Sequence, residues 1–163
     1  MFELKPITKE AIPRAIEKAE RYRLLNEPAE AESICLDVLK VEPENQKALI
    51  TLLLALTDQF DQGLPSSKAE ELLPRIKGEY DRTYYRGIIF ERHAKAHLKP
   101  EAKASRFMAY DWFCNAMKCF EKAESMQPPG NDDAQLRWNA CARILESHPD
   151  IVPEKERIEP PLE

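Results

Sequence analysis

The sequence predicts an all-α protein, and three observations support this class. The chain of 163 residues contains only 4 glycines, too few for the turns of a strand-rich fold. Its apolar residues (43%) and charged residues (33%) are in proportions typical of helical globular proteins. Apolar side chains recur at spacings of three and four, and most of the 13 prolines lie at the ends of these stretches or near the C-terminus. We therefore expect about seven helices.

The first predicted helix begins near Thr8 or Pro13, and apolar residues recur at helical spacing up to Tyr22. A turn at residues 26–28 separates it from a second helix. This second helix ends at Pro43, because proline cannot continue the backbone hydrogen bonding of a helix. The two helices form the first predicted antiparallel pair.

The most apolar predicted helix spans residues 46–62. Between Ala48 and Leu56 its side chains are apolar in almost every direction, which predicts burial on all sides. The sequence Gly-Leu-Pro at residues 63–65 ends this helix. Ser66 or Ser67 then caps another helix, whose apolar residues are Ala69, Leu72, Leu73 and Ile76.

A longer helical hairpin follows. Its first helix starts near Tyr80 and bends near residues 98–100, and its second helix starts between Pro100 and Arg106. Pro128 begins the Pro-Pro-Gly sequence that ends this second helix.

The last predicted helix is capped by one of residues 131–133, runs to about Glu146 and has two apolar stripes. One stripe is expected to pack on the preceding helix and consists of Ala134, Trp138, Cys141 and Leu145. The second stripe, the C-terminal apolar face, consists of Leu136, Ala140 and Ile144. No remaining helix of the chain covers this face, so we expect it to contact the tail, a partner or a second copy.

Residues 148–163 form a proline-rich acidic tail. Four prolines exclude a helix of any length, so we expect an extended chain. The tail offers a cover for the C-terminal apolar face through Ile151, Val152, Ile158 and Leu162.

One stretch has a specific pattern. Ala116, Phe120 and Ala123 place a small, an aromatic and a second small residue on one helix face, and Pro128 follows. This pattern resembles the second-helix half of a tetratricopeptide repeat. The resemblance implies that residues 8–147 form a short right-handed superhelix of stacked antiparallel helix pairs, an α-solenoid.

Two other regions fit the same repeat. Residues 12–45 form repeat one, in which the small, aromatic, small and small-to-medium positions are Ala19, Tyr22, Ala31 and Val38. In a third repeat, Gly87 is the close-packing small residue and Phe90 the aromatic. Glycine suits this place because two helices that cross at short distance leave no room for a side chain.

The resemblance implies a non-catalytic protein–protein interaction scaffold or adaptor. In this family the first helix of each repeat lines a concave groove for extended peptides. The groove residues implied for this chain are Arg23, Lys47, Ile50, Tyr84, Ile88, Glu91, Gln135 and Asn139. Two other functions stay open: a self-assembling structural subunit, which forms a homo-oligomer through the C-terminal helix, and an accessory or chaperone-like protein that holds an enzyme or client.

Charge is unevenly distributed. A basic hairpin carries seven cations: Arg82, Arg86, Arg92, Lys95, Lys99, Lys103 and Arg106. Three interpretations remain open: the hairpin and the acidic tail are solvated faces, the hairpin binds an acidic partner, or the tail lies on it. The net charge of −5 disfavours nucleic acid as a general ligand.

The sequence contains no motif for catalysis. It lacks a glycine-rich phosphate loop, a G-x-S-x-G turn and a zinc-ligand framework. His93 and His97 lie four residues apart, but a zinc site needs a third ligand, and the neighbouring cations would repel a metal ion. We therefore expect no enzymatic activity, no cofactor and no metal.

The remaining signals concern the compartment. None of the four cysteines forms a C-x-x-C pair, so we expect reduced thiols buried within helices. The longest apolar run, residues 48–56, is about half the length of a membrane span. Residues 1–6 lack the apolar core of a signal peptide. Together these observations predict a cytoplasmic protein that does not enter membranes.

Overall fold

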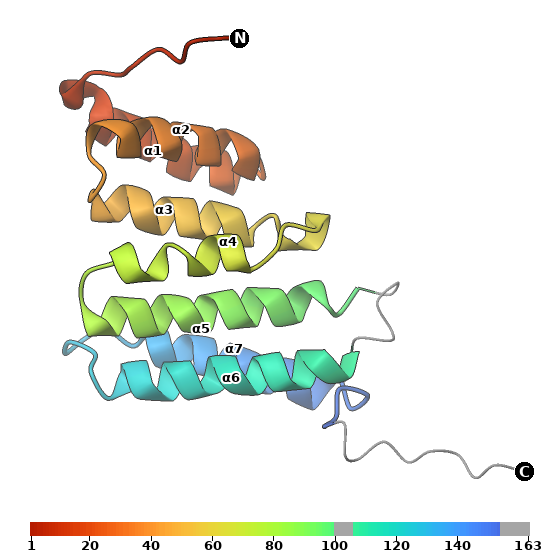
Figure 1. Ribbon diagram of the computed structural model, residues 1–163. Helices are drawn as coiled ribbons and strands as arrows, with labels where there is room; N and C mark the ends of the chain where they lie inside the picture. The colour runs from red at the N-terminus through yellow and green to blue at the C-terminus, as the bar shows by residue number, and fades with distance from the viewer. Residues whose placement is uncertain (100–105, 154–163) are drawn as a thin grey trace, which may run out of the picture. The chain divides into compact units, whose positions relative to one another are not determined.

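The computed structural model describes residues 1–99 and 106–153 (Figure 1). Within these ranges the regular structure consists of seven α-helices and three short 3-10 helices, without strands. The predicted all-α class is therefore confirmed for the described residues. The chain divides into two compact units, which span Met1–Gly78 and Glu79–Glu163.

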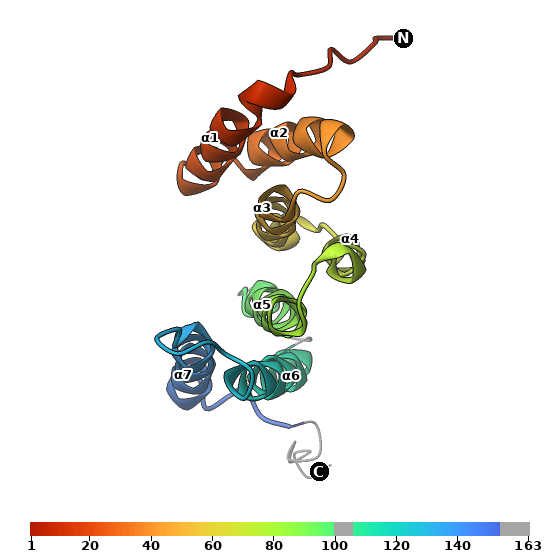
Figure 2. The same cartoon turned by 90° about the vertical axis from the view of Figure 1, so that its left-hand side faces the viewer.

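Unit 1 begins with a helical hairpin. Its helices are α1 (Ile12–Leu24) and α2 (Pro28–Val41), preceded by the 3-10 helix η1 (Lys9–Ala11). Helix α3 (Gln46–Thr57) packs mainly on α2, and Figure 2 shows α3 nearly end-on with α1 and α2 seen obliquely. The short elements η2 (Phe60–Gln62), α4 (Ser67–Glu70) and η3 (Leu73–Arg75) follow.

Prolines and one asparagine fix where the helices of unit 1 begin. Pro13 and Pro28 lie in the first turns of α1 and α2, where a missing N–H costs nothing. The Asn45 side chain accepts a hydrogen bond from the Ala48 N–H at 2.9 Å and caps α3. The predicted caps at Thr8 and Ser66 are not formed, because neither side chain makes a capping hydrogen bond.

The predicted helix over residues 46–62 is too long, because α3 ends at Thr57. The Gln59 side-chain amide donates to the Ala55 carbonyl at 3.1 Å and satisfies a carbonyl at the helix end. Gly63 then adopts a left-handed φ of 92°, which closes η2. The predicted burial of α3 is confirmed for most of its length.

The helix predicted after Ser66 is broken into α4 and η3. Pro74 lies in the first turn of η3, and its ring and missing N–H are incompatible with a continuous α-helix. The apolar residues assigned to this helix are nevertheless all buried, namely Ala69, Leu72, Leu73 and Ile76. The hydrophobic pattern therefore predicted the buried residues correctly, but the prediction of one continuous helix was wrong.

Unit 2 consists of α5 (Glu79–Ala96), α6 (Arg106–Glu124) and α7 (Asp133–Ser147). Helices α5 and α6 form a hairpin, and α7 packs on α6 (Figure 2). The Trp138 indole N–H of α7 donates to the Glu121 carboxylate of α6 at 3.0 Å. Together with the complete burial of Ala134 and Cys141, this contact agrees with the prediction that the first apolar stripe of α7 packs on α6.

Gly87 sets the distance between α5 and α6. A Cβ atom at this position would lie 2.6 Å from Cε1 of Phe120 and 2.9 Å from its Cδ1. The Phe120 ring is fully buried and has little room to move. The prediction that Gly87 allows close helix packing is therefore confirmed, and its neighbour is the aromatic residue of the 116–128 pattern.

We expect Gly87→Ala to destabilise the protein by about 1–3 kcal/mol, because the added methyl overpacks a filled core. Phe120→Leu alone should also destabilise it, because it removes buried ring atoms. The double variant Gly87→Ala/Phe120→Leu should cost less than the sum, since leucine lacks the Cε1 and Cζ atoms, and Cε1 is the atom nearest to the added methyl. Urea unfolding monitored by circular dichroism measures all three values. Strict additivity would contradict the contact.

Candidate interaction surfaces

Glu91 lies at the centre of unit 2 and is fully buried. Its carboxylate accepts hydrogen bonds from two nitrogens of Arg137 on α7, with the Nε contact at 3.0 Å. It also accepts one from Nζ of Lys95, one turn along α5, at 3.1 Å. The Cys141 thiol of α7 donates to the same group at 3.5 Å. The expectation that Glu91 faces an open groove is therefore wrong.

This cluster affects the ionisation of its members. Burial by itself would lower the pKa of Arg137, but the hydrogen bond to Glu91 and the charge of Glu91 raise it. The result is a pKa above the ordinary value of arginine. Burial, followed by the Glu91 charge, raises the pKa of the Cys141 thiol to about 12. The thiol therefore stays protonated at neutral pH and is a poor nucleophile.

The predicted groove residues of unit 2 do not form one surface. Ile88 is buried, like Glu91. On α7, Arg137 and Cys141 both reach Glu91 of α5. Gln135 is half-buried, with its side-chain carbonyl oxygen enclosed, whereas Asn139 is exposed.

Tyr84 instead belongs to an aromatic cluster on α5. Its ring stacks on Tyr80 at 5.9 Å, meets Tyr85 edge-on at 5.0 Å and contacts Phe120 at 5.8 Å between ring centroids. The three tyrosines are half-buried. Burial and then the charge of Asp133 on α7 raise the pKa of Tyr84. Tyr84 therefore lies where α5 and α7 approach each other.

In unit 1, Arg23 is engaged inside the unit. Its Nε and Nη2 donate to the two carboxylate oxygens of Asp58 at 2.7 and 3.3 Å. This bidentate pair joins the last turn of α1 to the C-cap of α3. The prediction that Arg23 is available to a partner is therefore corrected. Lys47 is exposed and Ile50 is half-buried.

The basic hairpin is partly neutralised by its own unit. Lys95 pairs with Glu91, and Arg106 pairs with Asp150. The hydrogen bond from Arg106 is the main cause that holds the pKa of Asp150 below its ordinary value. Arg82, Arg92 and Lys99 make other interactions, Arg86 is exposed, and Lys103 lies outside the described residues.

The beginning of the tail lies against α6. Asp150 pairs with Arg106 in the first turn of α6, and the adjacent Ile151 is buried. On the C-terminal apolar face, Leu136 is 62% exposed, whereas Ala140 and Ile144 are half-buried. Ile158 and Leu162, which were predicted to cover this face, lie outside the described residues.

The rings of His93 and His97 lie against each other, and His93 also contacts an aromatic residue. Their rings lie 4.6 Å apart, and His93 meets the Trp112 ring edge-on at 4.5 Å. Burial, followed by the charge of His97, lowers the pKa of His93. Among the described residues, no three or more His, Cys, Asp or Glu side chains are grouped so as to hold a metal ion.

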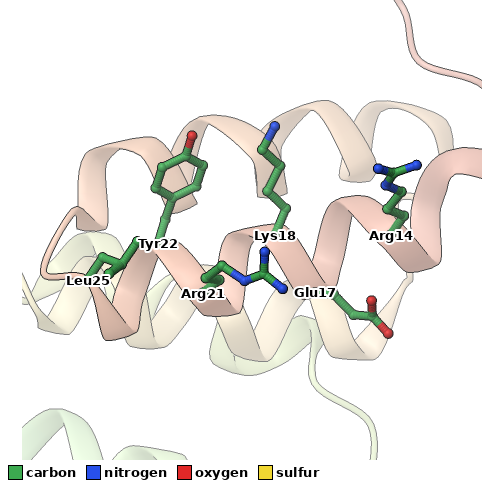
Figure 3. Close-up of a pocket in the computed structure, with 6 residues that line it drawn as sticks. All are labelled: Arg14, Glu17, Lys18, Arg21, Tyr22 and Leu25. Carbon is green, nitrogen blue, oxygen red and sulfur yellow. The ribbon is translucent and has the colours of Figure 1, made fainter.

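The sequence did not predict a shallow pocket of about 420 Å³ on α1 (Figure 3). The side chains of Arg14, Lys18 and Tyr22 stand side by side along one side of the helix, four residues apart (Figure 3). The full lining consists of Arg14, Glu17, Lys18, Arg21, Tyr22 and Leu25. The helical spacing of three cations was the signal that could have identified it.

Comparison with known proteins leaves the family undetermined. No family model, no curated protein and no solved structure matches this chain. The tetratricopeptide resemblance therefore stays a prediction from the residues themselves. In the part of the chain that the structure describes, no helix is long and apolar enough to cross a membrane.

We expect Arg137→Met to destabilise the protein by about 2–3 kcal/mol, because it removes the main partner of a buried charge. The value is below that of a fully enclosed pair, since the Arg137 side chain is 33% exposed and Lys95 still reaches Glu91. The double variant Glu91→Met/Arg137→Met should be closer to the parent than Arg137→Met. Urea unfolding tests this order, and a double variant that is less stable than Arg137→Met would refute it.

His93 should titrate below the ordinary histidine pKa of about 6.5 in an NMR titration of its ring. The unfolded chain then binds this proton more readily than the folded chain. His93 therefore costs no stability above pH ~6.5, and stability is lost as the pH falls below that value. His93→Phe keeps a ring beside Trp112 and should show a weaker loss between pH 7.5 and 5.5. An equal loss in both proteins would assign the effect to other groups.

Proposed function

We propose that this chain is a non-catalytic protein-interaction scaffold of the tetratricopeptide-repeat type, in which helical pairs stack as an α-solenoid. The close approach of α5 and α6 at Gly87 and Phe120 supports this proposal, because it gives the 116–128 pattern the packing role that the repeat requires. The internal pairing of Glu91 and Arg137 further supports a structural role for these charges.

The observation that carries a binding role is the half-buried tyrosine cluster of α5. Tyrosine and arginine are enriched at the energetic centres of protein interfaces, because they combine a large apolar area with a polar group. The rings of Tyr80, Tyr84 and Tyr85 lie together in half-buried positions, with the Tyr80 hydroxyl itself enclosed, and Arg137 of α7 exerts its charge on the Tyr84 hydroxyl. We infer that this tyrosine cluster is the main partner-binding surface of unit 2.

Site-specific photocrosslinking tests this role. The photoreactive residue p-benzoylphenylalanine, placed at Tyr80 or Tyr85, preserves an aromatic side chain in the cluster. The same residue at Asp111, an exposed position on α6, is the matched control. Irradiation in cells that naturally make the protein should yield a discrete crosslinked partner at the cluster positions and not at Asp111. The proposal fails if the folded variants give no crosslink, or the same products at all positions.

A further inference from the structure

One side of α1 carries a group of exposed cations around a shallow pocket. Arg14, Lys18 and Arg21 are exposed, and Glu17 is the one acid among the side chains that line the pocket. None of these three cations forms an ion pair or hydrogen bond within the described residues. Their charges are therefore available to a partner, unlike those of Arg23, Lys95 and Arg106.

Helix α1 ends in exposed apolar side chains. Leu24 is 88% exposed and Leu25 is 63% exposed, where α1 ends. The half-buried Tyr22 ring stands one turn before them on the pocket side (Figure 3). Leu25 lines the pocket together with the Tyr22 ring and adds apolar area beside it, whereas Leu24 lies about 100° further round the helix.

The three cations form a positively charged area on a unit whose net charge is negative. Residues 1–78 contain fourteen acidic and eleven basic side chains, so unit 1 is acidic as a whole. A local positive potential on an acidic unit attracts an acidic segment and orients it. A nucleic acid fits less well, because its phosphates gain nothing from the apolar surface of Tyr22 and Leu25.

The spacing of the groups indicates the shape of the partner. Arg14 and Lys18 are four residues apart, which corresponds to a rise of about 6 Å along α1. Carboxylates four residues apart on a second helix have the same spacing. One to two turns further on, an apolar residue of that helix would meet Tyr22 and Leu25.

We propose that this surface of α1 binds an acidic amphipathic helix of a partner protein. The helix carries Glu or Asp at positions i and i+4 and apolar residues at about i+8 and i+11. It docks through two charge pairs and one apolar contact, in the manner of a helix recognised by a shallow hydrophobic surface. This inference rests on the proposed binding role, but it concerns a surface in unit 1 and not the tyrosine cluster.

The test uses a fluorescein-labelled 18-residue helical peptide with that stripe, and a scrambled peptide of the same composition. Fluorescence anisotropy with the full chain should show the striped peptide binding at least tenfold more tightly than the scrambled one. Binding should weaken as salt is raised. A single-stranded DNA of equal charge should bind more weakly than the striped peptide. Absent binding, equal binding of both peptides, or tighter DNA binding would overturn the proposal.

Charge-reversal variants locate the site. Arg14→Glu/Lys18→Glu should weaken striped-peptide binding at least tenfold, and glutamate near the start of α1 is compatible with the helix dipole. The matched control Lys40→Glu/Lys68→Glu changes the net charge equally at exposed positions on α2 and α4 and should have an effect below twofold. Equal losses in the two variants would overturn the assignment to α1. Because neither variant alters the tyrosine cluster, the crosslinks from Tyr80 and Tyr85 report separately on the general binding role.

Discussion

The packing of unit 2 depends on one buried carboxylate. Glu91 has no exposed surface, and an ionised carboxylate without partners in such a place would be very costly. Arg137 and Lys95 offset that cost from two directions, one across to α7 and one along α5. The guanidinium holds its fork at a fixed angle, so the pair specifies the register of α7 against α5 as well as stabilising it. Apolar contacts alone would allow α7 to slide.

A second constraint is the space between α5 and α6. The missing side chain of Gly87 admits the Phe120 ring, so the two helices approach closely at this point. Glu91 follows Gly87 by one turn on α5. The closest contact of the hairpin and the buried carboxylate therefore lie near each other, and α6 and α7 are both positioned from the same part of α5.

Periodicity and proline positions were sufficient to predict much of the fold. They identified the helical class and the hairpin of α1 and α2, because these features depend on local spacing. The close-packing role of Gly87 came instead from the resemblance to a repeat. The end of α3 was missed because a side chain, Gln59, rather than a proline or glycine, satisfies the helix end. The break in the next helix was missed because the apolar residues between Ala69 and Ile76 have helical spacing, although Pro74 interrupts the helix.

The candidate surfaces were harder to predict than the helices. Spacing along α5 shows that Glu91 and Tyr84 share a side of the helix, but it does not show what lies opposite. The partner of Glu91 is Arg137, which is 46 residues away in the chain. Likewise, the sequence predicted that Arg23 is available to a partner, whereas the structure pairs it with Asp58, 35 residues away in the chain. The register of the repeat family predicts which side of a helix a residue lies on. Ion pairs between residues far apart in the chain decide whether the charge of that residue remains available to a partner.

The distribution of cysteines gives each unit its own internal reporter. Cys35 in α2 and Cys141 in α7 are fully buried, and burial is the largest cause that raises both thiol pKa values to about 12. Cys114 and Cys119 are half-buried on α6. A thiol reagent can modify the first two only after the surrounding helices open. The rate of labelling at Cys35 therefore reports the opening of unit 1, and the rate at Cys141 reports the opening of unit 2. One alkylation experiment thus measures whether the two units open together or separately.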